Sequence, residues 1–94
     1  MQPISIQNVE KREFLVQNEK YKMICFVFES GEGLPDHTHN GLAAIQVVSG
    51  DEDIQFVDGK QFSLSTGDVL GFDAKITHNV IAKEKSRVIV TIIF

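Results

Sequence analysis

Apolar runs separated by turn residues follow one another along the whole chain. Residues 20–30 and 42–49 are rich in aromatic and β-branched side chains, and a glycine follows each run. Residues 76–82 and 87–94 form two further runs of this kind. Turn signals therefore recur about every 8–12 residues, a rhythm typical of all-β sandwiches and barrels. The pattern predicts an all-β protein built from antiparallel strands, with little or no α-helix.

Apolar and polar residues alternate on both sides of Asp58 and Gly59. This dipeptide predicts a β-hairpin closed by a two-residue turn, because turns of the primed types need positive φ angles. Residues 51–53, with the sequence Asp-Glu-Asp, are interpreted as another polar hairpin turn. Residues 8–16 do not keep the 3.6-residue spacing of an amphipathic helix, so we expect an extended segment or one short turn leading into a strand.

Length, charge and cysteine content narrow the class of protein. A chain of 94 residues predicts a single domain over residues 1–94. Nine Lys and Arg against thirteen Asp and Glu give a net charge of −4, which disfavours nucleic acid and anionic membranes as partners. Cys25 is the only cysteine, so an internal disulfide is excluded. Neither a signal peptide nor an apolar run of about 18 residues is recognisable, and we expect a cytoplasmic location.

The three histidines are the most informative polar residues. His37 and His39 are two residues apart, so on an extended segment both project from the same face. His78 shares the strand parity of the apolar Ile76 and Val80, which predicts that it faces the interior. A buried imidazole without a partner is costly, and one divalent metal ion would satisfy all three rings at once. Two simpler interpretations stay open: a surface H-x-H pair, and a His78 that is only hydrogen-bonded in the core.

Together with the glycines around them, these histidines resemble two motifs of the cupin superfamily. The first motif, G-x5-H-x-H-x3,4-E-x6-G, is matched by Gly31, His37, His39 and Gly50. The second, G-x5-P-x-G-x2-H-x3-N, is matched by Gly67 and His78. The resemblance implies a double-stranded β-helix, a jelly-roll-like cupin barrel of two antiparallel sheets. It also implies that His37, His39 and His78 are metal ligands.

The match to the cupin motifs is incomplete at the metal-binding carboxylate. The family's Glu ligand falls at position 43 or 44, and both are alanine here. The second motif's Pro, Gly and Asn are replaced by Asp73, Lys75 and Ala82. Water or a bound ligand would then take the place of the missing Glu. Gln46 could take its place only if a bulge shifts the register of the strand, or if position 44 is the equivalent of the family's Glu. Three neutral imidazoles favour Zn, Fe, Ni or Cu over Mn and leave coordination positions open, as in catalytic sites.

Few other residues are suited to chemistry. Candidates for acid–base work near the predicted turns are Tyr21, Glu29, Asp36 and Asp73. Each of them is better explained as a solvated loop residue. Cys25 lies among apolar strand residues and is interpreted as a small core side chain. A basic cluster, interpreted as a solvated edge near a turn, is formed by Lys83, Lys85 and Arg87.

Three functions are compatible with these residues. The first is a metal-dependent enzyme, of oxygenase, isomerase or lyase type, that acts on a small organic or sugar-like ligand in the barrel. The alternative is a non-catalytic small-molecule binding or sensor protein with a degenerate metal site. The third is a barrel retained for assembly, with vestigial histidines. Because cupins host many unrelated functions, the fold does not decide among them.

Two segments predict a homodimer. Residues 88–94 and 23–28 are apolar at both strand parities, whereas a strand with one solvated face alternates. A barrel of this size has too little interior to bury both faces of both strands, so a partner surface is expected to cover them. Many small cupins pair through their outer sheets, and the resemblance therefore points the same way.

Overall fold

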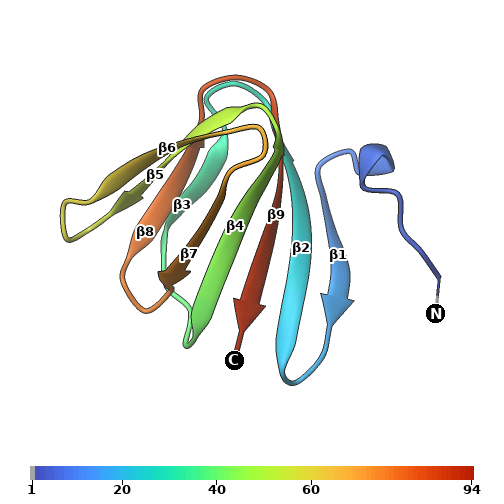
Figure 1. Ribbon diagram of the computed structural model, residues 1–94, viewed down its shortest axis with the longest axis horizontal. Helices are drawn as coiled ribbons and strands as arrows, with labels where there is room; N and C mark the ends of the chain where they lie inside the picture. Colours follow the sequence, from blue (N-terminus) through green and yellow to red (C-terminus); the bar gives the residue numbers. More distant parts are fainter. Residues whose placement is uncertain (1) are drawn as a thin grey trace.

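The computed structural model describes residues 2–94 as nine β-strands and one turn of 3₁₀ helix (Figure 1). The elements in chain order are η1 (Ile6–Asn8), β1 (Arg12–Gln17), β2 (Tyr21–Phe28), β3 (Gly33–His37), β4 (Leu42–Ser49), β5 (Asp51–Phe56), β6 (Gln61–Ser65), β7 (Val69–Asp73), β8 (His78–Ala82) and β9 (Ser86–Ile93). The predicted all-β class is confirmed. Of residues 8–16, positions 12–16 are extended as part of β1, as expected, and η1 includes only the first residue of this segment, Asn8. Within residues 2–94, no helix has the length and apolar character needed to cross a membrane.

The strands form two facing antiparallel sheets. One sheet has the order β1-β2-β9-β4-β7 and the other the order β3-β8-β5-β6. Consecutive strands are repeatedly placed in different sheets, so the chain crosses between the sheets as it winds around the core. This is the double-stranded β-helix, and the prediction of two antiparallel sheets in a jelly-roll-like barrel is confirmed.

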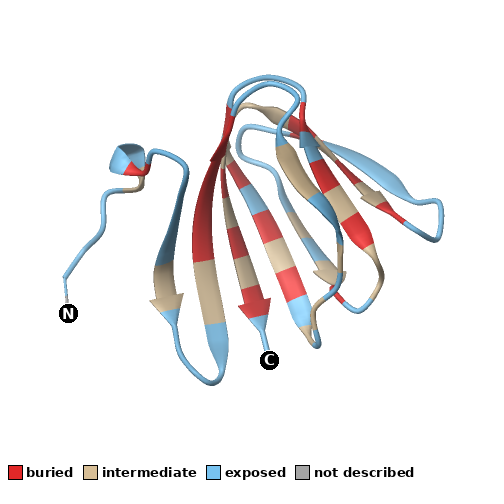
Figure 2. Ribbon diagram, turned by 180° about the vertical axis from the view of Figure 1, so that it is seen from behind, coloured by how far each residue is buried: buried red, intermediate tan, exposed pale blue. Residues whose placement is uncertain are grey.

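The core lies between the sheets because each strand turns alternate side chains inward. In β9, Val88, Val90 and Ile92 are buried, and in β5 Ile54 and Phe56 are buried, while their neighbours are more accessible. Figure 2 shows this as bands of buried and more accessible positions along the strands. Buried apolar residues of both sheets belong to one main core. Side-chain parity therefore decides which residues face the interior of the barrel.

The hairpin at Asp58 and Gly59 is confirmed, but the predicted two-residue turn is wrong. The loop between β5 and β6 is one residue longer, because the Phe56 N–H donates to the Lys60 carbonyl at 2.9 Å. The Gly59 N–H closes a turn onto the Phe56 carbonyl, and only Gly59 has a positive φ, of 95°. This is the pattern of a type I turn followed by a glycine bulge.

The N-terminal segment covers part of the outer face of β2. Cys25 and Val27 point away from the main core and pack against Val9 in a separate buried cluster. The Arg87 guanidinium donates hydrogen bonds to the carbonyls of Ile6 and Val9. The prediction that Arg87 belongs to a solvated edge is therefore wrong. Its side chain holds the N-terminal segment in place. The second apolar face of residues 23–28 is thus covered within the same chain.

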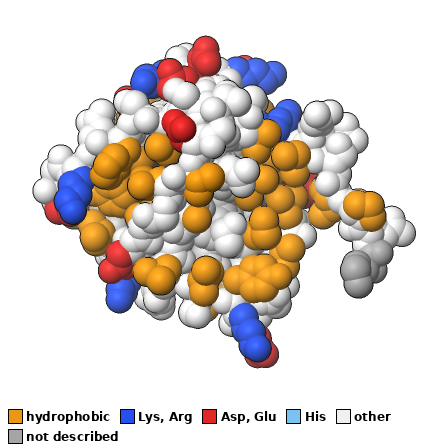
Figure 3. Space-filling model, viewed as in Figure 1, with side chains coloured by type: hydrophobic (Ala, Val, Ile, Leu, Met, Phe, Trp, Pro, Cys, Tyr) orange, Lys and Arg blue, Asp and Glu red, His pale blue; other side chains and the backbone are white. Residues whose placement is uncertain are grey.

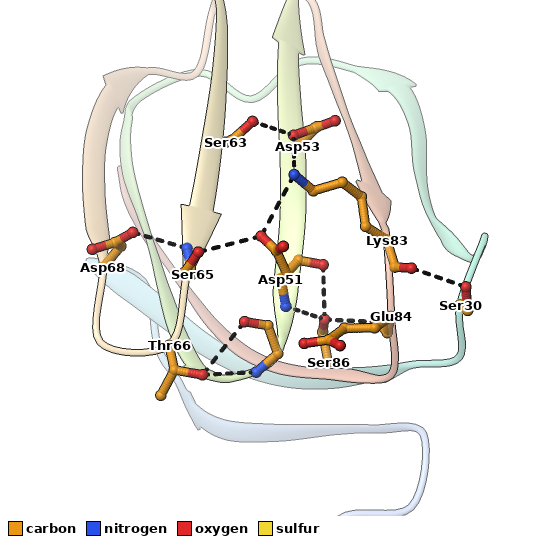
Figure 4. A network of polar contacts seen from close by, with 11 residues as sticks. Ser30, Asp51, Asp53, Ser63, Ser65, Thr66, Asp68, Lys83, Glu84 and Ser86 are labelled. Atoms are coloured by element: carbon orange, nitrogen blue, oxygen red, sulfur yellow. Dashed lines mark hydrogen bonds and ion pairs between the residues drawn. The ribbon is translucent and has the colours of Figure 1, made fainter.

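Residues 51–53 are not the predicted polar turn but the start of β5. Asp51 and Asp53 point outward to Lys83, whose Nζ lies 3.6 and 3.3 Å from them, within the polar network of Figure 4. Glu52 points the other way, into the barrel, and is 0% exposed. Within residues 2–94, neither of its carboxyl oxygens has a hydrogen-bond partner. Burial raises the pKa of Glu52 to about 7, with a further contribution from Asp51.

Candidate metal centre

Two neighbouring strands bring His37 and His78 face to face. His37 ends β3, His78 begins β8, and the two residues are direct cross-strand partners. The register of this pair of strands shifts between Leu34 and His37, where Pro35 has no N–H to donate to the ladder. Such an irregularity bends a strand and re-aims its side chains. The two ring centroids lie 4.3 Å apart in an edge-to-face arrangement.

Backbone carbonyls orient both rings. Nδ1 of His37 lies 2.6 Å from the Pro35 carbonyl oxygen, and Nδ1 of His78 lies 2.7 Å from that of Ile76. Because a carbonyl oxygen can only accept, Nδ1 of each ring must donate. Nε2 then carries the free lone pair in both histidines. Metal-binding histidines are typically prepared in this way, with one nitrogen donating to a fixed partner.

The extended segment expected to carry both His37 and His39 ends at His37, so His39 lies beyond β3 and that expectation is wrong. Its backbone N–H donates to the Ala74 carbonyl at 2.8 Å instead of continuing the ladder with β8. The His39 ring nevertheless stays 5.2 Å from the His37 ring, so His37 contacts both other histidines. Burial lowers the pKa of His39, and the neighbouring His37 and Lys22 lower it further.

The prediction that His78 faces the interior is confirmed. Its side chain is only 2% exposed and lies beneath two aromatic rings, with the centroid of Phe72 at 4.8 Å and that of Phe56 at 5.8 Å. Burial lowers the pKa of His78 despite its hydrogen bond to the Ile76 carbonyl. The imidazole is therefore neutral at pH 7, which is the state a metal ligand needs.

Position 43, where the family's Glu ligand is expected, faces the interior of the barrel but carries an uncharged alanine. Ala43 is buried, and its neighbour across the sheet is Phe72. Ala44 and Gln46 lie on the opposite face of β4, where Gln46 is exposed. The pairing of β4 with β7 runs without a bulge from Leu42 to Gln46, so Gln46 does not reach the histidines.

The three histidines are of the right type and close enough together to bind one metal ion, but their side chains do not yet form a ready-made metal site. His37, His39 and His78 supply imidazole nitrogens, the kind of donor that Zn, Fe, Ni and Cu prefer. Histidines on one ion, with nitrogens about 2.0–2.1 Å from it, have ring centroids roughly 5 Å apart. The observed centroid distances, 4.3 and 5.2 Å, are of this size. In residues 2–94, however, no three His, Cys, Asp or Glu side chains form a ready-made metal-binding group.

A cavity of about 270 Å³ opens beside His37 and His39. Its apolar walls come from β1, β2, β3 and β9 and include Ile24, Phe26 and Ile92. His78 does not line this cavity. Its ring contacts His37 on one side and Phe56 and Phe72 on the other, and these two phenylalanines line a second cavity of about 220 Å³.

None of the predicted acid–base candidates lines the cavity beside the histidines. Asp36 accepts a hydrogen bond from the Asn79 amide, and Asp73 lines the second cavity. Glu29 pairs with Lys85 at 3.7 Å.

Two functional candidates were missed in the sequence, Arg12 and Lys22, which both line the cavity. The parity of β2 carries a signal for Lys22, because it shares a face with the buried Ile24 and Phe26.

Comparison with known proteins identifies the family. Residues 25–94 match the Cupin domain family, and the chain therefore belongs to the cupins. No curated protein sequence is significantly similar to this chain.

Solved cupin structures are closely similar over nearly the whole chain. An RmlC-like cupin from Desulfovibrio desulfuricans has a TM-score of 0.86 and 25% identity, over 99% of this chain and 96% of that chain. A cupin superfamily protein from Desulfitobacterium hafniense has a TM-score of 0.85 and 20% identity, over 93% and 83% of the two chains. KdgF from a Halomonas species has a TM-score of 0.76 and 24% identity, over 85% and 75%. These similarities show a complete cupin barrel.

Proposed function

We propose that this cupin holds a divalent metal ion on His37, His39 and His78 and acts on a small organic ligand in the adjoining cavity. The observation that carries the proposal is the His37–His78 pair. Its rings lie 4.3 Å apart, and backbone carbonyls bind both Nδ1 atoms and leave both Nε2 atoms free. Without a carboxylate ligand, the site is expected to prefer Zn, Fe, Ni or Cu to Mn.

The side chains around the histidines suit this function. A bound ion would supply a Lewis acid that polarises an oxygen of the ligand. Phe56 and Phe72 exclude water from the inner side of His78. The apolar walls of the 270 Å³ cavity hold the body of the ligand next to His37 and His39.

A second function, ligand binding without catalysis, is favoured by one observation. Among residues 2–94, the side chains that line this cavity include no Asp, Glu, Tyr, Ser or Cys, so only Lys22 remains for proton transfer once the two histidines hold a metal ion. The two functions differ in turnover, whereas both retain metal and ligand binding. The third function, a barrel retained only for assembly, predicts neither metal binding nor ligand binding.

Metal binding tests the proposal directly. Protein stripped with a chelator and titrated with Zn²⁺ in a calorimeter is expected to bind one equivalent. Replacing His78 by Ala removes one of three ligands and is expected to weaken binding by more than about 100-fold. Asn79→Ala is the matched control, because this neighbour on β8 bonds to Asp36 outside the histidine cluster. Circular dichroism monitors the fold. Equal metal content in wild type and His78→Ala, or none in wild type, would contradict the proposal.

We also propose a homodimer formed through the five-stranded sheet. Leu42 and Ile93 are cross-strand partners on β4 and β9, and both remain more than half exposed, at 60% and 54%. Val69 on β7, opposite Gln46 on the outer face of β4, is similarly exposed. On the face of the molecule shown in Figure 3, apolar side chains occupy much of the middle, and most charged side chains lie toward the edge. A second copy of the chain would cover such a surface.

Light scattering at micromolar concentration is expected to give twice the chain mass of 10.5 kDa. Ile93→Glu places a charge on the proposed interface and is expected to give monomers. Val57→Glu is the control, because Val57 is 76% exposed at the tip of the β5–β6 hairpin in the other sheet. A monomeric wild type, or a dimer unaffected by Ile93→Glu, would refute the dimer.

A further inference from the structure

Two cationic side chains line the apolar cavity beside the histidines. Arg12 on β1 pairs across the strands with Phe26, and Lys22 lies on β2 at the parity of Ile24 and Phe26. Both therefore lie on the face of the sheet that looks into the barrel, where the other side chains of β2 are apolar. A charged residue at such a position is costly unless it snorkels to water or meets a partner of opposite charge.

The part of the chain that the structure describes provides no partner of opposite charge for Arg12 or Lys22. Although the protein carries a net charge of −4, no Asp or Glu of the described residues lines this cavity. The ion pairs within residues 2–94 all involve Lys83 or Lys85, and none involves Arg12 or Lys22. The positive charge also reaches the histidines, because Lys22 contributes to the lowered pKa of His39.

Both cations are held by aromatic rings and not by acids. The Arg12 guanidinium lies 5.5 Å from the centre of the Phe14 ring, and the Lys22 ammonium lies 5.9 Å from that of Phe94. A cation–π contact orients a cation but leaves its hydrogen-bond donors free. The guanidinium can then bind a carboxylate through two parallel N–H donors.

We propose that the cavity binds a small organic carboxylate, with the anionic group at Arg12 and Lys22 and an apolar body extending toward His37 and His39. The volume of about 270 Å³ and the apolar walls suit a single anionic group on a compact hydrocarbon frame. This inference rests on the proposed function, because it takes the small organic ligand of that proposal to be a carboxylate.

Benzoate and its uncharged analogue benzamide test this assignment on chelator-treated protein, with binding followed by ligand-observed NMR. Benzoate is expected to bind at least about tenfold more tightly than benzamide, and added salt is expected to weaken only benzoate binding. Arg12→Gln and Lys22→Gln should each reduce benzoate affinity about tenfold and leave benzamide binding unchanged. Lys22→Arg keeps the charge and is expected to keep the affinity. Lys20→Gln, in the nearby β1–β2 turn and outside the cavity, is the control.

Equal binding of benzoate and benzamide, or benzoate affinity unchanged in both Gln variants, would overturn the carboxylate site. The His78→Ala variant separates this result from the metal proposal, because His78 does not line the cavity. Benzoate binding that persists in His78→Ala supports the carboxylate site whether or not wild type binds metal. Metal binding without selective benzoate binding would refute the carboxylate site alone.

Discussion

Replacing Glu52 by Gln is expected to remove about 3 kcal/mol of pH dependence from the folding stability. Glu52 is fully buried without a hydrogen-bond partner, and its pKa rises from 4.5 to about 7 on folding. Between these values the native state keeps a proton that the unfolded chain has lost. Stability from this group is therefore complete below about pH 4.5, declines by about 1.4 kcal/mol per pH unit, and levels off above about pH 7.

Urea unfolding of wild type and Glu52→Gln from pH 4 to pH 8.5 measures this effect. The difference between the two curves isolates Glu52 from His39 and His78, whose lowered pKa values make stability fall toward acid pH. Glu84→Gln, at an exposed turn position, is the control and should change little. Parallel curves for wild type and Glu52→Gln would show that the carboxyl is paired or hydrated in solution.

Replacing Gly33 by Ala is expected to destabilise the protein by about 3 kcal/mol or more. An added Cβ would overlap the backbone carbonyl of Val80 on β8, lying only 2.7 Å from its carbon. Backbone in a paired strand cannot yield as a flexible side chain can, so β3 must move away from β8. Because these strands hold His37 opposite His78, the variant should also lose metal affinity.

Thermal unfolding followed by circular dichroism checks this prediction. A loss of about 3 kcal/mol corresponds to a melting temperature lower by roughly 15 °C for a domain of this size. Gly71→Ala is the matched control, because the nearest atom to its Cβ would be the Ala43 carbonyl oxygen at 3.9 Å. A Gly33→Ala variant as stable as Gly71→Ala would mean that β3 is not held tightly against β8.

The local pattern of apolar, glycine and histidine residues predicted much of the fold but less of the site. The spacing of apolar runs and the glycine–histidine motifs predicted two antiparallel sheets, and parity alone placed His78 inside. Parity also carried the signal for Glu52, which alternates with Ile54 and Phe56. The Asp-Glu-Asp composition of the segment suggested a turn instead, because a buried unpaired carboxyl is rare.

The rest of the site depends on tertiary contacts that no local pattern contains. His39 leaves the strand because its N–H bonds to Ala74, 35 positions away in the chain. Arg12 enters the site only because β1 pairs with β2 at the edge of the larger sheet. Likewise, the partners of Arg87 are carbonyls near the N-terminus, so its side chain could not be distinguished from a solvated one.

Because the N-terminal segment covers Cys25, the rate at which this thiol is alkylated can be used to follow opening of the structure. Cys25 is the sole thiol of the chain and is 0% exposed beneath the segment that Arg87 fastens. Burial also raises the pKa of this thiol, which keeps it in the unreactive protonated form. An alkylating reagent can therefore reach it only when the N-terminal segment lifts or the barrel opens. The labelling rate at this one atom reads out how often the edge of the larger sheet is uncovered.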